Sequence, residues 1–247
     1  MMAKNVLTHN LSEPLGGATT AKIDIDNGDG NLMVDRLEDD EQVLVNGTLQ
    51  YLENQALPTR SVNTTNGQAT LTLKASGSTR QTWFRLPWAT CNGATEWQIH
   101  LNPNVPSDIT AHSDGGNVKL NLAGMAITRL SADTGGGNMD VVLPDNAANL
   151  SVIARSGAGN VTVEIGRGAT GNNTVNANSG AGNVVVCMPS GIAARIHATS
   201  GMGKVIVDSR FSKIDSKTYQ SPDYDGAANK IEITLKSGAG NVSVNSK

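Results

Sequence analysis

The side chains in this sequence that could take part in catalysis are few and poorly spaced for it. The four histidines include no pair at the spacing of a zinc-binding His-Glu-x-x-His motif, and the sequence has no Gly-x-Ser-x-Gly nucleophile elbow. A carbohydrate-active enzyme would need two carboxylates about 5–10 Å apart on one face, and three aspartates are candidates by position only. Because such residues are usually solvated in turns and strands, we predict no catalytic residue, no metal site and no enzymatic activity. The residues considered are His9, His100, His112, His197, Asp114, Asp133 and Asp140.

Two segments resemble ligand-binding loops, and both are better explained as turns. Residues 166–171 match the Gly-x-Gly-x-x-Gly pattern, but a dinucleotide site needs a following helix, and residues 172–176 have the pattern of a turn and a strand. Residues 24–30 resemble a calcium loop, but placing its last glycine at position 6 puts Ile25 at the first ligand position and Arg36 at the twelfth. We therefore expect no bound nucleotide, calcium or other cofactor.

Aromatic residues make up only 3% of the chain, and all of them except Tyr51 lie in two segments, residues 78–106 and 209–229. Covering of a sheet edge is the simpler explanation of both segments, because open edges pair with other chains. The alternative for the first segment is an interaction surface, since aromatic side chains are enriched at recognition sites. The residues of that candidate surface are Trp83, Phe84, Trp88 and Trp97.

The dominant feature of the chain is a short motif that reads small residue, Gly, any residue, Gly, Asn, aliphatic, any residue, Val. It occurs at residues 156–163, 179–186 and 237–244, and looser copies occur elsewhere. Its fifth position falls at residues 117, 138, 160, 183, 204 and 241, at intervals of 21, 22, 23, 21 and 37 residues. A repeat of this length predicts stacked units, and it contains no reactive group. The motif residues to which we assign a structural role in turns are Gly28, Gly30, Asn31, Gly116, Asn117, Gly137, Asn138, Gly157, Gly159, Asn160, Gly180, Gly182, Asn183, Gly201, Gly203, Gly238, Gly240 and Asn241.

Each repeat contains two short strands of alternating character, as in residues 161–165 and 174–178. We predict that the turn glycines adopt positive φ and that the asparagines stack into a hydrogen-bonded ladder. The pattern favours an all-β fold, a β-solenoid of about 21–23 residues per coil with two strands and Gly/Asn turns. An antiparallel meander, with the motif as its hairpin loop, is the alternative.

We expect one all-β domain over residues 1–247. Residues 1–110 form its N-terminal section, and residues 111–247 form the regular repeats, with an aromatic insertion at 209–229. The interval of 86 residues between Asn31 and Asn117 is close to four repeats. It therefore predicts degenerate coils in this part of the chain.

Composition and charge exclude several classes of partner. The net charge is −3, and no cluster of lysine and arginine provides an electrostatic surface for nucleic acid. The sequence contains no run of 18 apolar residues, so we expect no transmembrane segment. Residues 1–7 also lack the apolar run of a secretory signal, and together these two observations predict a cytoplasmic location. Cys91 and Cys187 belong to no Cys-x-x-Cys pair or metal-ligand cluster, so free thiols are expected, although the sequence leaves open whether the two meet.

Several segments of the chain are informative when they are taken together, namely residues 97–103 with 113–117, 138–144, 187–189, 229–235, and 21–34 with 43–47. In their order and spacing these segments resemble the DUF4097 family, also called the toastrack or adhesin-like β-repeat family. The resemblance covers nearly the whole chain. It implies a β-repeat fold related to the C-terminal domain of LiaF-like envelope-stress regulators, without catalytic residues to carry over. Members are often attached to membranes, so the resemblance leaves a membrane-associated or cell-surface location open.

The expected function is that of a non-enzymatic structural or interaction protein, an adhesin-like scaffold that binds a protein partner or associates with itself. One alternative is a ligand-sensing module for a peptide, lipid headgroup or glycan. A second is a self-assembling scaffold, because uncapped ends of a stack bind further copies. A third is a carbohydrate-active enzyme built on a solenoid.

Overall fold

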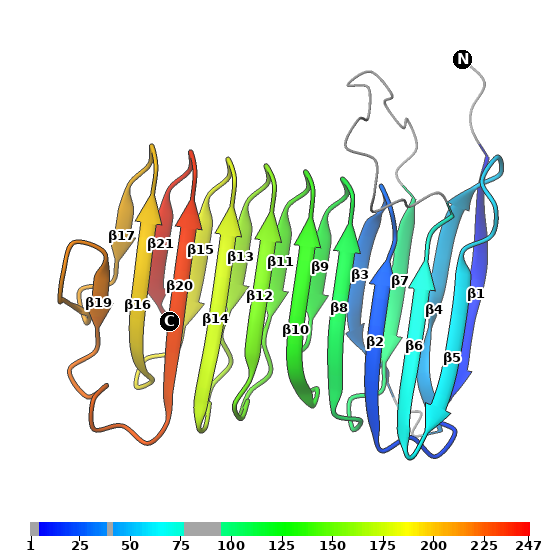
Figure 1. The fold of residues 1–247 in the computed structure, drawn as a ribbon, viewed down its shortest axis with the longest axis horizontal. Coiled ribbons are helices and arrows are strands. Elements are labelled where there is room, and N and C mark those ends of the chain that lie inside the picture. The colour runs from blue at the N-terminus through cyan, green and yellow to red at the C-terminus, as the bar shows by residue number, and fades with distance from the viewer. Residues whose placement is uncertain (1–4, 39–41, 77–94) are drawn as a thin grey trace.

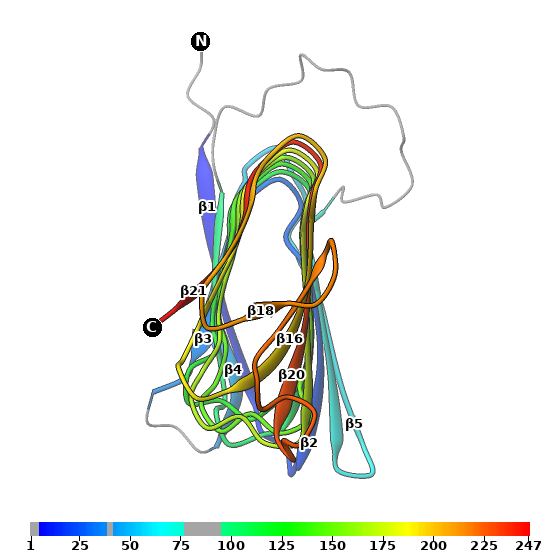
Figure 2. The ribbon, with the colours of Figure 1, turned by 90° about the vertical axis from the view of Figure 1, so that its left-hand side faces the viewer.

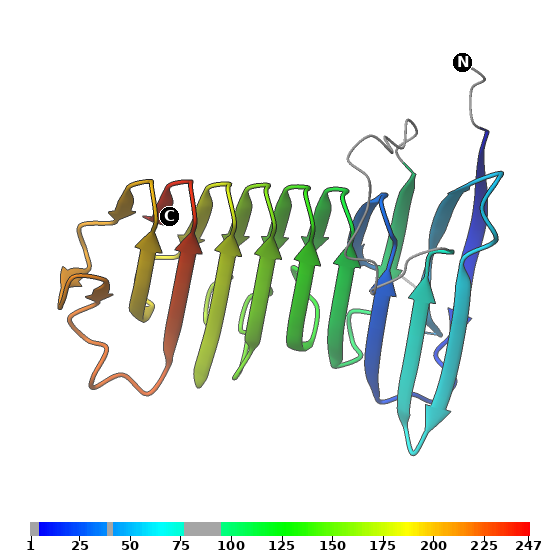
Figure 3. The same ribbon diagram turned by 45° about the horizontal axis from the view of Figure 1, so that its top comes forward.

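The computed structural model describes residues 5–38, 42–76 and 95–247. Throughout these residues the secondary structure consists of β-strands joined by turns, without a helix. The strands stand side by side along the long axis of the molecule and form two facing layers (Figures 1 and 3). This arrangement confirms the all-β prediction.

Two mixed sheets make up the part of the chain that the structure describes. Sheet A has ten strands in the spatial order β1 (Val6–Pro14), β4 (Val43–Leu52), β7 (Glu96–Leu101), β3 (Asn31–Arg36), β9 (Val118–Asn121), β11 (Met139–Val142), β13 (Val161–Glu164), β15 (Val184–Met188), β21 (Val242–Ser246) and β17 (Val205–Val207). Sheet B has eleven strands in the order β18 (Ser212–Lys213), β19 (Thr218–Gln220), β16 (Ala193–Ser200), β20 (Lys230–Ser237), β14 (Asn172–Ser179), β12 (Ser151–Ser156), β10 (Ile127–Thr134), β8 (Ser107–Ser113), β2 (Thr20–Asp26), β6 (Gln68–Lys74) and β5 (Thr59–Thr65).

One coil consists of a strand of sheet B, a tight upper turn, a strand of sheet A and a wider lower turn (Figure 2). Neighbouring coils pair in parallel, and equivalent residues align across them. Val161 of β13, for example, lies opposite Met139 of β11 on one side and Val184 of β15 on the other. The parallel register confirms the predicted β-solenoid with two strands per coil and is incompatible with an antiparallel meander.

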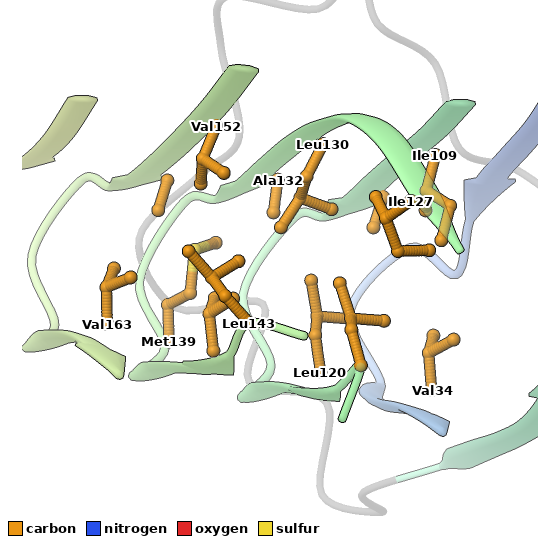
Figure 4. Close-up of a cluster of buried hydrophobic side chains, with 14 of the residues drawn as sticks. Val34, Ile109, Leu120, Ile127, Leu130, Ala132, Met139, Leu143, Val152 and Val163 are labelled. Atoms are coloured by element: carbon orange, nitrogen blue, oxygen red, sulfur yellow. The ribbon is translucent and has the colours of Figure 1, made fainter. Parts of the chain in front are cut away.

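The core lies between the two sheets and consists almost entirely of aliphatic side chains. Along β12 and β13 buried and more exposed residues alternate, as expected for strands that cover one side of a core. Side chains of sheet B, such as Leu130 and Val152, point toward Leu120 and Met139 of sheet A (Figure 4). Because the two layers are close together, Val, Ile, Leu and Ala fill the space without many aromatic rings.

At the C-terminal end, the order of the coils in space differs from their order in the sequence. The coil β16–β17 is outermost, and β20–β21 lies between it and β14–β15, although β20–β21 comes last in the chain. Residues 208–229 connect β17 to β20 and carry the chain back to the inner position. The interval of 37 residues before Asn241 is therefore a return connection added to an ordinary coil.

At the N-terminal end, the coil β6–β7 likewise lies outside the earlier coil β2–β3. Between Asn31 and Asn117 the described residues contain the parallel strands β6 and β7 and the antiparallel strands β4 and β5. Antiparallel strands therefore occupy part of this interval, and degenerate coils over its whole length remain a prediction.

Antiparallel strands cover both sheets at the N-terminal end of the stack and sheet B at its C-terminal end. At the N-terminal end, β4 pairs with β7 and β1 pairs with β4, while β5 pairs with β6. At the C-terminal end, β19 pairs with β16 and β18 pairs with β19, and Phe211 of the same connection is buried in the core. The aromatic insertion at 209–229 thus covers an edge of sheet B, which is the simpler of the two interpretations.

Candidate functional site

The upper turns of the stack form a row of buried hydroxyl groups that join neighbouring coils. The hydroxyl of Ser156 donates to the carbonyl oxygen of Gly137 on the preceding coil at 2.8 Å and accepts from the amide of Gly159 in its own turn at 2.8 Å. Ser179 makes the same two bonds one coil further on. The small first residue of the motif is therefore a hydrogen-bonding residue that satisfies two backbone groups at a buried position.

The asparagines at the fifth motif position form the predicted ladder on the same turns. The amide N–H of Asn160 donates to the side-chain oxygen of Asn138 at 2.9 Å, and the amide N–H of Asn183 donates to that of Asn160 at 2.9 Å. In addition, the side-chain amide of Asn183 donates to Asn160 Oδ1 at 3.2 Å. The order in space runs through Asn31, Asn117, Asn138, Asn160, Asn183 and Asn241, and ends at Lys204.

The motif glycines are required for a reason other than the predicted one. Of the glycines that we singled out, Gly28 alone has a positive φ, at 64°, so the prediction of positive φ at the other motif glycines is wrong. A Cβ on Gly159 would lie 2.0 Å from the carbonyl oxygen of Gly137, and one on Gly182 would lie 2.1 Å from that of Gly159. Adjacent turns therefore approach too closely for any side chain at these positions.

Replacing Ser156 by alanine is expected to lower the free energy of unfolding by about 1–3 kcal/mol, because a buried carbonyl and a buried amide lose their shared partner. Urea denaturation of the full chain measures the change. Ser151→Ala is the matched control, since Ser151 is only half-buried on the outer face of sheet B and accepts one bond from Thr174. Equal midpoints for the two variants would contradict the structural role of the hydroxyl row.

A cleft of about 740 Å³ opens along the lower turns of the stack. The turns that follow β11, β13 and β15 line it, together with Lys247 after β21. Four charged residues contribute to the lining, namely Asp145, Glu164, Arg167 and Lys247. We call this feature the lower-turn cleft.

The charged residues of the lower-turn cleft are held by neighbouring coils. The amide N–H of Arg167 donates to Asp145 Oδ1 at 2.6 Å, and the ammonium group of Lys247 forms an ion pair with Glu164. The side chains of this ion pair are 43% and 44% exposed, so water and a ligand can both reach them. At Gly191 the wall is bare backbone, because glycine has no side chain. This backbone faces open space, since a Cβ there would meet no atom within 4 Å.

The volume of the lower-turn cleft lies within the range of about 300–1,000 Å³ that is typical of ligand sites. Its lining combines two carboxylates with an arginine and a lysine, which suits a ligand that carries both acidic and basic groups. The sequence analysis missed this feature because the lower turns do not share a motif. The available signal was the segment 166–171, four residues of which line the cleft as part of a turn between two strands.

The structure does not bring the candidate catalytic carboxylates together as one group. Asp140 lies on the outer face of sheet A, whereas Asp133 lies on sheet B, 3.8 Å from Arg155. Asp114 Oδ1 is 3.2 Å from Nε2 of His112. His100 is hydrogen-bonded to Asp35, His9 lies on β1 and His197 lies on β16. Within the described ranges, no group of three or more His, Cys, Asp or Glu side chains could hold a metal ion.

The candidate aromatic surface is largely outside the described residues, and its one described member is buried. Trp97 is 1% exposed, and its indole N–H donates to the carbonyl oxygen of Gln50 at 3.0 Å. It therefore belongs to the core and not to an interaction surface, which corrects the prediction for this residue. Trp83, Phe84, Trp88 and Cys91 lie outside the described residues, and Cys187 is a half-buried free thiol.

Tyr224 anchors the return connection to the outermost coils. The guanidinium of Arg195 lies 4.3 Å from the centre of its ring and the ammonium group of Lys230 lies 5.0 Å from it. The phenol donates to Glu232 at 3.0 Å. Burial, followed by the hydrogen bond to Glu232 and the charge of that carboxylate, raises the pKa of the Tyr224 phenol. The aromatic ring thus serves to hold residues 208–229 against the stack.

One comparison with a solved structure agrees with the fold. A crystal structure described as a putative cell adhesion protein from Clostridium sporogenes matches 98% of this chain and 100% of its own, with 22% sequence identity and a TM-score of 0.70. A putative adhesin from Bacteroides fragilis aligns over 98% of both chains with 11% identity and a TM-score of 0.30. No curated protein matches the sequence significantly. In the described part of the chain no helix is long and apolar enough to cross a membrane.

Two family models match the sequence and together span most of it. The model of the cell wall-active antibiotics response LiaF C-terminal region matches residues 152–244. The model of the N-terminal domain of toast_rack, DUF2154, matches residues 2–164, which is well over half of the chain. Both matches agree with the family that the repeat motifs indicated. The protein is therefore a member of the toastrack family.

Proposed function

We propose that the protein is a non-enzymatic, adhesin-like interaction scaffold that binds a charged peptide segment of a partner protein in the lower-turn cleft. The observation that carries this proposal is the convergence of Asp145, Glu164, Arg167 and Lys247 around one concave surface. The description of the Clostridium structure as a putative cell adhesion protein supports an interaction function as well.

The architecture suits such a role, because parallel coils with aligned registers form a stiff support for their turns. Lower turns can differ from coil to coil without disturbing the aligned strands, so they provide the variable surface of the molecule. A peptide is favoured as the ligand because it offers charges of both signs together with backbone donors and acceptors. The cleft walls offer the complementary set: carboxylates, cations and the open backbone at Gly191.

Arg167→Glu is expected to weaken binding of charged peptides at least tenfold, because it replaces an attractive charge by a repulsive one in the lower-turn cleft. The test selects peptides from a displayed random library on the full chain and compares their affinities for the variant by titration. Arg155→Glu is the matched control, since Arg155 is also an exposed arginine but lies on the outer face of sheet B.

Peptides that bind both variants equally would contradict the cleft as the binding site. Selection of no peptide, combined with cleft-dependent binding of glycans or lipid headgroups on an array, would show that the ligand class is wrong. The non-enzymatic part has its own test. Turnover of a panel of glycosidase and esterase substrates that is lost on Asp133→Asn or Asp140→Asn would overturn it.

A further inference from the structure

The C-terminal coil β20–β21 lies in a slot whose two walls precede it in the sequence. One wall is β14–β15, with which it pairs through eight and five aligned residue pairs, and the other is β16–β17. The chain must therefore complete both walls before its last coil enters between them. The residues that form the slot and the residues that fill it are therefore separate segments of the sequence.

The contacts that hold the coil in the slot are the ones that every motif coil offers. The amide N–H of Asn241 donates to Asn183 Oδ1 at 2.8 Å, and the hydroxyl of Ser237 donates to the carbonyl oxygen of Gly182 at 2.8 Å. The same bonds join β14–β15 to the coil before it, where Asn183 N–H donates to Asn160 at 2.9 Å. These backbone and amide groups are identical in every copy of the protein, so the slot does not distinguish its own coil from that of a second copy.

The outer wall of the slot has supports of its own. Strand β16 pairs with β19 on its far side, and Phe211 of the connection is buried in the core. The outer coil also ends the asparagine ladder, because Lys204 donates its amide N–H to Asn241 Oδ1 at 2.9 Å but has no side-chain acceptor for a further coil. A charged lysine at the edge also opposes additional stacking. At its C-terminal end the molecule thus has an internal slot, and antiparallel strands cover the outer edge of sheet B beyond it.

We propose that the slot also accepts residues 230–246 of a second copy, so that two copies exchange their C-terminal coils and form a closed dimer. Residues 221–229, which connect β19 to β20, would act as the hinge, and most of them, namely residues 222, 223, 225, 226, 228 and 229, are exposed. Lys247 follows the exchanged coil, so Lys247 of the second copy would pair with Glu164 and complete the lower-turn cleft. The proposal rests on the slot contacts and is independent of the ligand bound in the cleft.

The test uses full-length chains with single engineered cysteines in a background with Cys91→Ser and Cys187→Ser. Asn178 of β14 pairs with Lys236 of β20, and Lys236 pairs with Thr199 of β16. Neighbouring strands are about 4.8 Å apart, within disulfide reach, whereas Asn178 and Thr199 are two strands apart at about 9.6 Å, beyond the limit of about 7 Å. Asn178→Cys chains are mixed with Lys236→Cys chains of a different size and incubated just below the melting temperature. They are then cooled and oxidised.

Coil exchange predicts a mixed disulfide dimer of the two chains, at least tenfold more abundant than in a control mixture of Asn178→Cys and Thr199→Cys chains. The double variant Asn178→Cys/Lys236→Cys is expected to form an intramolecular disulfide without incubation, which checks the sheet order and the reactivity of the thiols. Equal dimer yields in the two mixtures would overturn the proposal. Failure of the double variant to close would overturn the slot itself.

Discussion

Gly159→Ala is expected to lower the free energy of unfolding by about 3 kcal/mol, although it adds only one methyl group. The added Cβ would lie 2.0 Å from the carbonyl oxygen of Gly137 and 2.4 Å from its carbon, both on the neighbouring coil. These atoms belong to the backbone and cannot move aside without separating two coils that the Ser156 hydroxyl and the asparagine ladder hold together. Thermal and urea unfolding of the purified full chain measure the effect.

Gly136→Ala is the matched control, because Gly136 lies in the same kind of turn, between the two glycines of the motif, where a side chain has room. A Cβ there would be 3.8 Å from the carbonyl oxygen of Gly115, which is an ordinary contact, and Gly136 has no positive φ. Alanine at this position is expected to be neutral, or to stabilise slightly by restricting the unfolded chain. If both variants unfolded at the same urea concentration, close packing of the turns would not be the reason for the glycines.

Trp97→Ala is expected to destabilise the protein by about 3–5 kcal/mol, the range for removal of a large buried aromatic side chain. Trp97 is 1% exposed on β7, between β3 and the covering strand β4, and it is hydrogen-bonded to the backbone of Gln50. Loss of the Trp97 side chain would leave a cavity and would weaken the contact between β7 and the covering strand β4. Chemical denaturation gives the magnitude.

Trp97→Phe separates the two contributions, because it keeps most of the ring volume but removes the indole N–H. A loss clearly smaller than that of Trp97→Ala is expected. Peptide binding in the lower-turn cleft should be unchanged in both variants at temperatures where they remain folded, since Trp97 does not line the cleft. A variant that is fully stable but defective in binding would instead support the interaction-surface interpretation of this tryptophan.

The sequence by itself determined the repeating part of the fold. The regular spacing of the Gly-x-Gly-Asn motif predicted parallel coils, and the asparagine that recurs at one motif position predicted the ladder. The coils and the ladder could be predicted because both depend on contacts between identical positions of neighbouring coils. Residues such as Asn138, Asn160 and Asn183 therefore carry the information locally. The family followed from the same motifs.

Only the tertiary structure decided the order of the coils and the burial of Trp97. Because each motif coil offers the same hydrogen bonds, β20–β21 fits chemically against β14–β15 or outside β16–β17, and the return connection places it inside. The lower-turn cleft likewise joins residues from different turns, such as Asp145 and Lys247, that no local pattern relates. The repeated motif determines that one motif coil stacks on another. The path of the connecting segments determines which two coils become neighbours.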